Sequence, residues 1–382
     1  MTLLVKIVGR IVSWIGRNGG LNIRSITWHG DHALVLDQTA LPATVRFIEV
    51  RTPDDMIDVI ERLVIRGAPA LAVAGAFGIA LAALHHERGG TSKETLFDEV
   101  ARIRSARPTA VNLAWGVDHV LPAMEGGSAA VIAAAEALAE CDAMVNGRLA
   151  QRGARFVAEL CGPKPFGIQT HCHTGSLACI EWGTALGIIH VLHDMGMVGH
   201  VYVGETRPLL QGSRLTSFEL MHLGVPHSIV VDGAGPSMIA RGDASVVIVG
   251  ADCITANGDV VNKIGTYPLA LAAWRAGIPF IVSAPEATID ESIASGSDVK
   301  IEMRDPNEVL SYAGQVIAPL GAKAINPAFD ITPADLVTAI VTEDRILRPD
   351  RAGLRPIHQP VHQPAHHVWA SVAPTAATTT TI

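Results

Sequence analysis

The stretch FGIQTHCHTGS (Phe166–Ser176) sets the pattern for the second half of the chain. A short apolar run ends in a polar cluster, and a helix-like pattern follows it. The order then recurs, with apolar runs at His200–Val203, His227–Val231, Ser245–Val249 and Pro279–Ser283 and helix patterns at Ser176–Met195, Ser213–Leu223 and Tyr267–Ala276. Strands that alternate with helices predict a parallel sheet covered on both faces. We therefore expect an α/β fold with a Rossmann-like sheet in the C-terminal part.

The first part of the chain has a mixed pattern instead. Short alternating stretches predict strands at Ser25–Trp28 and Ala33–Leu36, and Ala-rich segments predict helices at Pro53–Ile65, Pro69–His85, Ser92–Ser105, Val111–Met124 and Gly126–Asn146. This indicates a smaller α+β domain over residues 23–145, followed by the Rossmann-like domain over residues 146–350. An amphipathic extension is expected over residues 1–22, and a disordered, low-complexity tail over residues 351–382.

Composition excludes a largely disordered chain, because 49% of the residues are hydrophobic and only 17% are charged. The charge-free run Gly67–Leu84 is long enough to cross a membrane. It is mostly Ala and Gly, with Pro69 near its start, so a buried helix is the expectation. Membrane contact is therefore expected only through Met1–Arg17, whose apolar residues have helical spacing beside basic ones. A helix that packs on the core is the alternative there.

Charge and cysteine content exclude several classes of protein. The formal net charge is -8 and no basic stripe is present, which argues against nucleic-acid binding. The 5 cysteines include no CxxC pair, and no cleavable secretory signal is evident. We therefore expect neither a disulfide scaffold nor a zinc ribbon, and we expect a cytoplasmic location. No Walker A or GxGxxG pattern follows a strand, and no GxSxG is present, so the usual nucleotide and hydrolase fingerprints are missing.

Cys172 is the first candidate for chemistry. It follows an apolar strand and precedes Thr174-Gly175-Ser176, which is expected to open a helix. The backbone N–H groups of a helix N-terminus lower the pKa of a thiol, which suits a nucleophile or a proton-transferring thiolate. A small buried apolar residue is the structural alternative. The flanking His171 and His173 suggest a metal, but no spaced second cluster of ligands supports one.

Asp252 is the second candidate, since it ends the apolar run Val246–Ala251. A carboxyl set against an apolar wall has a raised pKa and acts as an acid near neutrality. A loop or capping aspartate is the alternative. Ligands of parallel sheets bind just beyond the carboxyl ends of the strands. Both candidates are strand-end residues, so we expect them at one site.

Three short segments point to an anionic small ligand. Each places basic residues beside a turn that leads into a helix, where the first N–H groups are free. They are Arg66-Gly67-Ala68, Arg107-Pro108-Thr109 and Asn262-Lys263. Any one of them is a weak signal, because a basic residue before a helix is common. Together, in an acidic and otherwise apolar chain, they favour a phosphate-bearing ligand.

Several longer segments give the combination a recognisable form. They are LDQTALP (Leu36–Pro42), IRGAPALAVAGAFG (Ile65–Gly78), RPTAVNL (Arg107–Leu113), THCHTGSLA (Thr170–Ala178), GTALG (Gly183–Gly187), ETRPLLQGSRLT (Glu205–Thr216), GADCITANGDVVNKIGTYPLA (Gly250–Ala270) and NPAFDITP (Asn326–Pro333). In this order they resemble the family that contains methylthioribose-1-phosphate isomerases, ribose-1,5-bisphosphate isomerases and the regulatory subunits of the eukaryotic translation-initiation exchange factor.

The resemblance implies an aldose–ketose isomerase of methionine salvage, which converts 5-methylthioribose 1-phosphate to 5-methylthioribulose 1-phosphate. It implies a homodimer with no metal or nucleotide cofactor, and Cys172 and Asp252 as the catalytic pair. It assigns substrate contacts to Arg66, Gly67, Ala68, Arg107, Gln211, Asn262 and Lys263. Asp252, protonated, would assist ring opening. Hydrogen would then move from C2 to C1, as a proton through a Cys172 thiolate or by a direct hydride shift.

The chain departs from the family beside the implied catalytic pair. His173 stands where Asn is usual, and Cys253 stands where Arg is usual. These positions bear on the sugar's C5 substituent, so 5-deoxyribose 1-phosphate and ribose 1,5-bisphosphate are alternative substrates that a side-by-side rate comparison separates. A non-catalytic subunit that senses sugar phosphates is a further alternative. Retention of Cys172 and Asp252 with the RGA and RPTAVN segments favours an enzyme.

Overall fold

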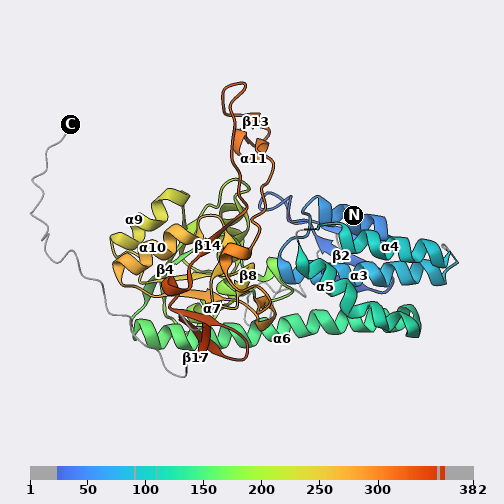
Figure 1. The fold of residues 1–382 in the computed structure, drawn as a ribbon, viewed down its shortest axis with the longest axis horizontal. Helices are drawn as coiled ribbons and strands as arrows, with labels where there is room; N and C mark the ends of the chain where they lie inside the picture. The colour runs from blue at the N-terminus through green and yellow to red at the C-terminus, as the bar shows by residue number, and fades with distance from the viewer. Residues whose placement is uncertain (1–23, 90–91, 109, 351–352, 358–382) are drawn as a thin grey trace, which may run out of the picture.

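The computed structural model describes residues 24–89, 92–108, 110–350 and 353–357. It contains an N-terminal and a C-terminal part side by side, with one long helix running along both (Figure 1). The extension predicted over residues 1–22, including Met1–Arg17, lies outside the described residues, as do residues 358–382 of the predicted tail.

The N-terminal part is a small antiparallel sheet packed against helices, as the α+β prediction requires. Its strands are β1 (Ile26–His29), β2 (His32–Leu36) and β3 (Phe47–Val50), and its helices are α2 (Pro53–Glu61), α3 (Ala68–Glu87), α4 (Lys93–Ser105), α5 (Val111–Val120) and the 3-10 helix η2 (Leu121–Gly126). Local capping fixes two helix starts: Thr52 and Asp55 form a capping box on α2, and Ser92 accepts the Thr95 N–H on α4.

Helix α3 is the charge-free run of the sequence. It is long and apolar enough to cross a membrane, and 78% of its most apolar window is buried inside the protein. Among the described residues it is the one helix that passes this test. It is apolar on all sides because it is covered on all sides, by β1, α2, α4, α5 and α6. Its burial is that of a core helix, as predicted.

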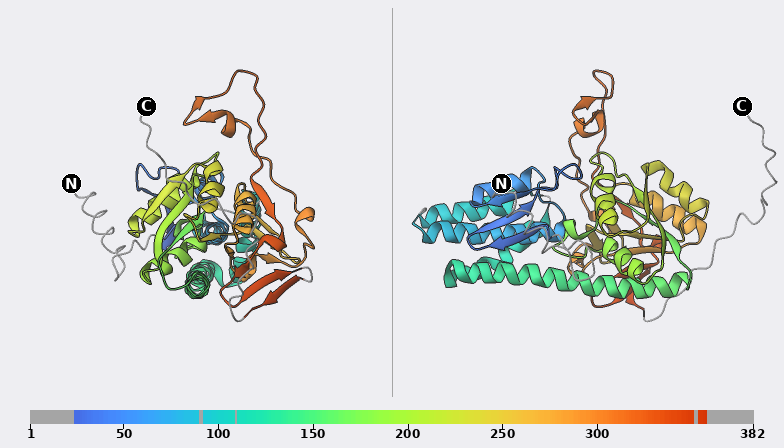
Figure 2. Two further views of the ribbon diagram at one scale, coloured as in Figure 1. Left: turned by 90° about the vertical axis from the view of Figure 1, so that its left-hand side faces the viewer. Right: turned by 180° about the vertical axis from the view of Figure 1, so that it is seen from behind.

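Helix α6 (Gly127–Cys161) is continuous over 35 residues and joins the two parts. It packs against α3 in the N-terminal part and against α7 (Ala185–Asp194) in the C-terminal part. Seen from behind, it runs along the length of both (Figure 2). The domain boundary predicted between residues 145 and 146 falls inside this helix, so the helix belongs to both parts.

The C-terminal part is built on an eight-stranded sheet in the order β17-β16-β15-β10-β7-β4-β5-β6. The strands are β4 (Phe166–Thr170), β5 (Val198–Gly204), β6 (His227–Val230), β7 (Val246–Val249), β10 (Phe280–Ser283), β15 (Ala339–Val341), β16 (Ile346–Asp350) and β17 (Gly353–Pro356). From β15 to β6 every neighbouring pair is parallel, and β16 and β17 add an antiparallel edge.

Both faces of this sheet are covered, which confirms the predicted fold class. Along β7, Val246 and Ile248 pack with α6 and α7, whereas Val247 and Val249 pack with helices on the other face. The other helices and short helical turns are η3 (Ser176–Ala178), the turn Gly212–Thr216, α8 (Ser217–His222), η5 (Asp232–Ala234), α9 (Gly235–Ala240), α10 (Thr266–Ala276), η6 (Glu286–Thr288), η7 (Gly296–Asp298) and η8 (Ala334–Leu336).

A second sheet and a projecting arm complete the fold. The sheet has the order β11-β8-β9-β14, with strands β11 (Ile289–Asp290), β8 (Cys253–Thr255), β9 (Val260–Lys263) and β14 (Phe329–Thr332). The arm carries α11 (Asn307–Leu310), β12 (Ser311–Tyr312) and β13 (Gln315–Val316), and it projects away from the body of the protein (Figures 1 and 2). The sequence patterns predicted neither feature.

Two predictions of local structure are wrong. Ser176–Met195 is not one helix: a 3-10 turn ends at Ala178, and α7 begins only at Ala185. Gly175, before the turn, forms an isolated antiparallel β-bridge with Gly183, before α7. A Cβ on Gly183 would lie 2.3 Å from the Thr174 carbonyl oxygen. In the predicted disordered tail, Gly353–Pro356 instead forms β17, because its backbone pairs with β16.

We predict that Gly116→Ala destabilises the fold through the contact between α3 and α5. A Cβ at Gly116 would lie 2.1 Å from the Ala72 carbonyl oxygen, so the helices must separate. Overpacking of this kind costs about 1–3 kcal/mol, although alanine favours helix formation. Urea unfolding measures the change. Gly233→Ala is the control, since a Cβ there meets nothing within 4 Å; equal stability of both variants would contradict the packing.

Candidate active site

Cys172 lies at the carboxyl end of β4 in a strained backbone conformation. Its φ is 61°, in the left-handed region that costs a residue with a side chain about 1–3 kcal/mol. Its N–H donates to the Thr206 hydroxyl at 2.9 Å, and its carbonyl accepts the Thr216 hydroxyl at 2.6 Å. Two threonine side chains therefore hold both backbone polar groups of this residue, and its thiol is buried.

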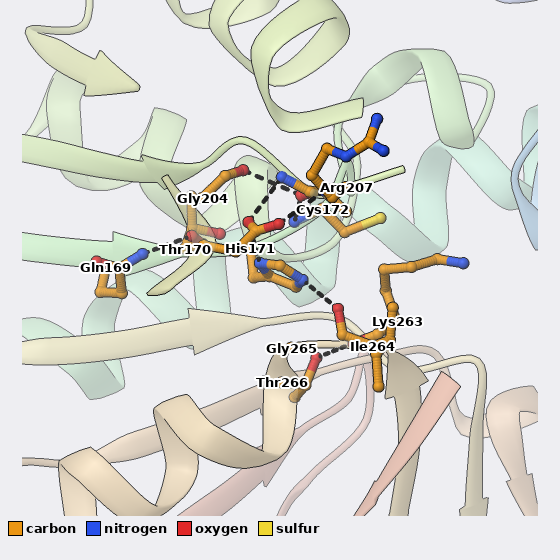
Figure 3. Close-up of polar contacts among 12 residues, drawn as sticks. Gln169, Thr170, His171, Cys172, Gly204, Arg207, Lys263, Ile264, Gly265 and Thr266 are labelled. Carbon is orange, nitrogen blue, oxygen red and sulfur yellow. Dashed lines mark hydrogen bonds and ion pairs between the residues drawn. The ribbon is translucent and has the colours of Figure 1, made fainter. Parts of the chain in front are cut away.

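The ends of the neighbouring strands are tied to one another around Cys172. The N–H groups of Thr206 and Arg207, just beyond β5, donate to Asp232 at 2.8 and 2.7 Å. The His171 ring donates through Nε2 to the Ile264 carbonyl at 2.7 Å, and Figure 3 shows this link from β4 to the residue after β9. His171 is thus committed to a structural hydrogen bond.

The Cys172 sulfur and the Lys263 ammonium group point toward the same space (Figure 3). Burial raises the pKa of the Cys172 thiol, and the nearby positive charges of Arg66 and Lys263 oppose that shift. The predicted lowering of this pKa by a helix N-terminus is therefore wrong. The reason is that only a 3-10 turn follows Cys172, while protein on all sides removes water from the sulfur.

Asp252 lies between β7 and β8 and faces the same charges. Burial raises the pKa of Asp252, and Lys263, Arg66 and Arg107 oppose the shift. The raised pKa confirms the direction predicted for an acid against an apolar strand. Asp252 keeps exposed surface although protein charges lie close to it, so a dissolved ligand can reach its carboxyl.

Arg66 and Arg107 bring positive charge from the N-terminal part. Gly67 has a φ of 103°, and a Cβ there would lie 2.2 Å from the Ala178 carbonyl oxygen. Arg66-Gly67-Ala68, at the start of α3, is therefore pressed against the turn that follows Cys172. Arg66 Nη1 is buried without a partner among the described residues. Burial lowers the pKa of Arg107, whose charge interacts with Arg66 and Asp252.

The remaining predicted contacts lie on elements that frame this cluster. Asn262 is buried on β9, where its amide donates to the Thr266 hydroxyl at 2.9 Å. Lys263 Nζ lies 4.7 Å from the centre of the Phe329 ring. Gln211 is buried just before the turn that carries Thr216, and its Oε1 has no partner among the described residues. The structure thus groups Cys172, Asp252 and the basic residues, while the roles of all these residues remain predictions.

Sequence reasoning missed several residues that build the site. Thr206, Thr216 and Asp232 hold the strand ends, and Glu219 on α8 bonds His173. Thr206 and Asp232 stand in segments that follow strands, so their position in the sequence could have identified them. Glu219 gave none, because a helical pattern does not show which tertiary partner a side chain meets. Within the described ranges, no group of three or more His, Cys, Asp or Glu side chains is placed to hold a metal ion.

Comparison with known proteins gives concordant matches. A model described as the initiation factor 2 subunit family matches residues 64–349. The chain is 49% identical over 324 residues to a probable bifunctional methylthioribose-1-phosphate isomerase/methylthioribulose-1-phosphate dehydratase from Nocardia farcinica, covering 85% of this chain but only 59% of that relative. It is 44% identical over 337 residues to methylthioribose-1-phosphate isomerase from a Synechococcus strain, covering 85% of this chain and 95% of that relative.

Solved structures of two kinds share the fold. One is 5-methylthioribose 1-phosphate isomerase from Pyrococcus horikoshii, with a TM-score of 0.77, 34% identity, and coverage of 85% of this chain and 92% of that one. The other is the translation initiation factor eIF-2B subunit delta from A. fulgidus, with a TM-score of 0.76, 39% identity, and coverage of 86% and 96%. The fold is therefore shared by proteins with both names.

We predict that Arg66 provides most of the affinity of this site for inorganic phosphate. Its buried, unpartnered Nη1 is a charge-assisted donor, the kind that binds phosphate strongly. Millimolar phosphate should raise the melting temperature of the unsubstituted protein by about 2–4 °C, and Arg66→Gln should remove most of that increase. Arg62→Gln is the control, because Arg62 is exposed and paired with Asp58 at 2.6 Å. An unchanged phosphate response in Arg66→Gln would contradict the assignment.

Proposed function

Because the chain belongs to the initiation factor 2 subunit family, we propose that it is an aldose–ketose isomerase of methionine salvage. Its proposed reaction converts 5-methylthioribose 1-phosphate to 5-methylthioribulose 1-phosphate. One observation carries the proposal: the charges of Arg66 and Lys263 act on both Cys172 and Asp252, and the charge of Arg107 acts on Asp252. The isomerase names of the Nocardia and Synechococcus relatives support it. The dehydratase half of the Nocardia name is not carried over, since the chain spans only 59% of that protein.

The geometry suits the difficulty of this reaction. Phosphate on C1 of the sugar prevents the ring from opening freely to an aldehyde. Asp252, whose pKa is raised by burial, would donate a proton to the ring oxygen as the bond from C1 to that oxygen breaks. The hydrogen on C2 then moves to C1, and the C2 hydroxyl loses its proton and becomes the ketone. Cys172 would carry that hydrogen as a proton, or would border a direct hydride shift.

The basic residues supply the electrostatic part of the mechanism. Arg66, Arg107 and Lys263 would hold the phosphate and stabilise negative charge that develops on the substrate oxygens. They act in a site from which protein removes much of the water, so their effect is larger than at the surface. Arg66 and Arg107 come from the N-terminal part and Lys263 from the C-terminal part. Substrate would therefore bind across the junction between them.

A regulatory role without catalysis is the alternative function: the A. fulgidus initiation factor subunit shares the fold, but the isomerase names of the sequence relatives do not favour that role. Such a protein has no need of a thiol held in a strained backbone near a carboxyl whose pKa is raised. Comparison of rates on 5-methylthioribose 1-phosphate, 5-deoxyribose 1-phosphate and ribose 1,5-bisphosphate, with products identified by phosphorus and proton NMR, tests the function and its substrate together. Absence of turnover on all three sugars would favour the regulatory role.

We also propose a cytoplasmic homodimer. The lack of a CxxC pair among the 5 cysteines supports a reducing compartment. Large apolar side chains exposed on the arm, among them Val316, Ile317 and Leu320, support a further protein contact. Analytical ultracentrifugation tests the proposed assembly, and a monomer at micromolar concentration would contradict it.

We predict that Cys172→Ser and Asp252→Asn each lower kcat at least about 1,000-fold, with substrate affinity changed by less than about threefold. Neither substitution removes a group proposed to hold the phosphate. Turnover of 5-methylthioribose 1-phosphate and equilibrium binding are the measurements. Cys161→Ser is the matched control, because Cys161 lies at the end of α6 and should keep the normal rate. Near-normal kcat in either site variant would show that the catalytic pair is misassigned.

We predict a bell-shaped dependence of kcat/KM on pH that moves to higher pH in Lys263→Met. The active form needs Asp252 protonated and Cys172 ionised, so activity falls below the lower pKa and above the higher one. The Lys263 charge opposes the rise of the pKa at both groups, so its removal should move both limbs upward, by about one unit. Lys263→Arg keeps the positive charge, so both limbs of the pH profile should stay in place. A downward movement in Lys263→Met would contradict the proposed protonation states.

A further inference from the structure

His173 directly follows Cys172, and its ring is buried against α8. Its Nε2 lies 2.6 Å from Oε1 of Glu219. The same carboxylate accepts the N–H and the hydroxyl of Ser176, both at 2.8 Å, and the N–H of Leu177 at 3.2 Å. One buried carboxylate therefore fixes both the His173 ring and the start of the turn Ser176–Ala178.

The hydrogen bonds define the protonation of this pair. Glu219 receives only donors, and together they hold its pKa below the ordinary value although burial acts to raise it. Burial lowers the pKa of His173, with Glu219 opposing the shift. Glu219 is therefore the acceptor in this pair, and Nε2 of His173 carries the donated proton. Nδ1 of His173 is buried with no partner among the described residues, so the ring is held from one side by Glu219.

The backbone of His173 connects this pair to the reactive sulfur. The backbone N–H of His173 acts to lower the pKa of the Cys172 thiol, against the larger effect of burial. Thr216 holds the carbonyl side of the peptide between Cys172 and His173, and the bond from His173 to Glu219 holds the residue that carries its N–H. Gly175 completes the arrangement, because a Cβ there would lie 2.4 Å from Glu219 Oε1.

We propose that His173 and Glu219 are positioning residues that fix the His173 amide donor on the sulfur of Cys172. The inference rests on the proposed function, in which that sulfur borders or carries the transferred hydrogen. Neither side chain is assigned a contact with substrate. The pair acts together with Thr216 on the orientation of the peptide between Cys172 and His173. Misplacement of a reacting group by about 1 Å costs on the order of 100-fold in rate.

The test compares His173→Ala, His173→Asn and Glu219→Gln. Turnover gives kcat and KM, and the pH dependence of iodoacetamide labelling gives the thiol pKa of Cys172, with Cys172→Ser subtracting other cysteines. His173→Ala and Glu219→Gln should lower kcat about 10–100-fold, with KM within about threefold, and raise the thiol pKa. His173→Asn, which keeps an N–H donor for Glu219, should restore kcat to within about fivefold of normal.

The direction of the thiol shift separates positioning from simple charge. If charge alone acted, Glu219→Gln would lower the thiol pKa. The substitution removes a negative charge, while the positive charges of Arg66 and Lys263 remain near Asp252 and the sulfur. His222→Asn is the control, since His222 lies on α8, is exposed and bonds the Phe218 carbonyl. It should leave every readout unchanged.

A lowered thiol pKa in Glu219→Gln, or an unchanged thiol and kcat in His173→Ala, would overturn the positioning role. Should Glu219→Gln fail to fold, the pair of His173 variants decides alone. Labelling needs no substrate, so failure of the proposed function can be told apart from failure of the positioning role. If the unsubstituted protein shows no turnover but the variants shift the thiol pKa as expected, the isomerase activity is rejected and the positioning role of His173 and Glu219 stands.

Discussion

The left-handed backbone at Cys172 is the constraint on which the site depends. A residue with a side chain adopts this conformation only where its surroundings over-determine it. Here the hydroxyls of Thr206 and Thr216 hold its N–H and carbonyl, and each threonine comes from a different segment beyond β5. The turn is buried, so its backbone polar groups need protein partners. Meeting that requirement brings the ends of the parallel strands into one cluster.

The same burial determines the chemistry of the cluster. Burial raises the pKa values of the Asp252 carboxyl and the Cys172 thiol, and nearby cations reduce the shifts without reversing them. Those cations come from both parts of the chain. The contact of Gly67 with the Ala178 backbone and the unbroken helix α6 fix how the two parts meet. The positions of the charges therefore depend on the packing between the parts.

Features that depend on local sequence were predictable, and those set by distant partners were not. The apolar run before Asp252 predicted both its strand-end position and its raised pKa, because the strand itself forms the apolar wall. The predicted helix after Cys172 failed because Gly175 and Gly183 bridge across the loop, and the predicted thiol pKa failed with it. The pairing of Glu219 with His173 had no sequence signal, since it joins residues 46 apart.

In the proposed mechanism, phosphate and sugar lie between Arg66, Lys263, Cys172 and Asp252. A crystal structure of Cys172→Ser with bound 5-methylthioribose 1-phosphate tests it most directly. The account predicts phosphate oxygens within hydrogen-bond distance of Arg66 and Lys263, the ring oxygen facing Asp252, and the C1–C2 bond facing residue 172. A sugar phosphate bound elsewhere, or one whose ring oxygen lies beyond the reach of Asp252, would contradict it.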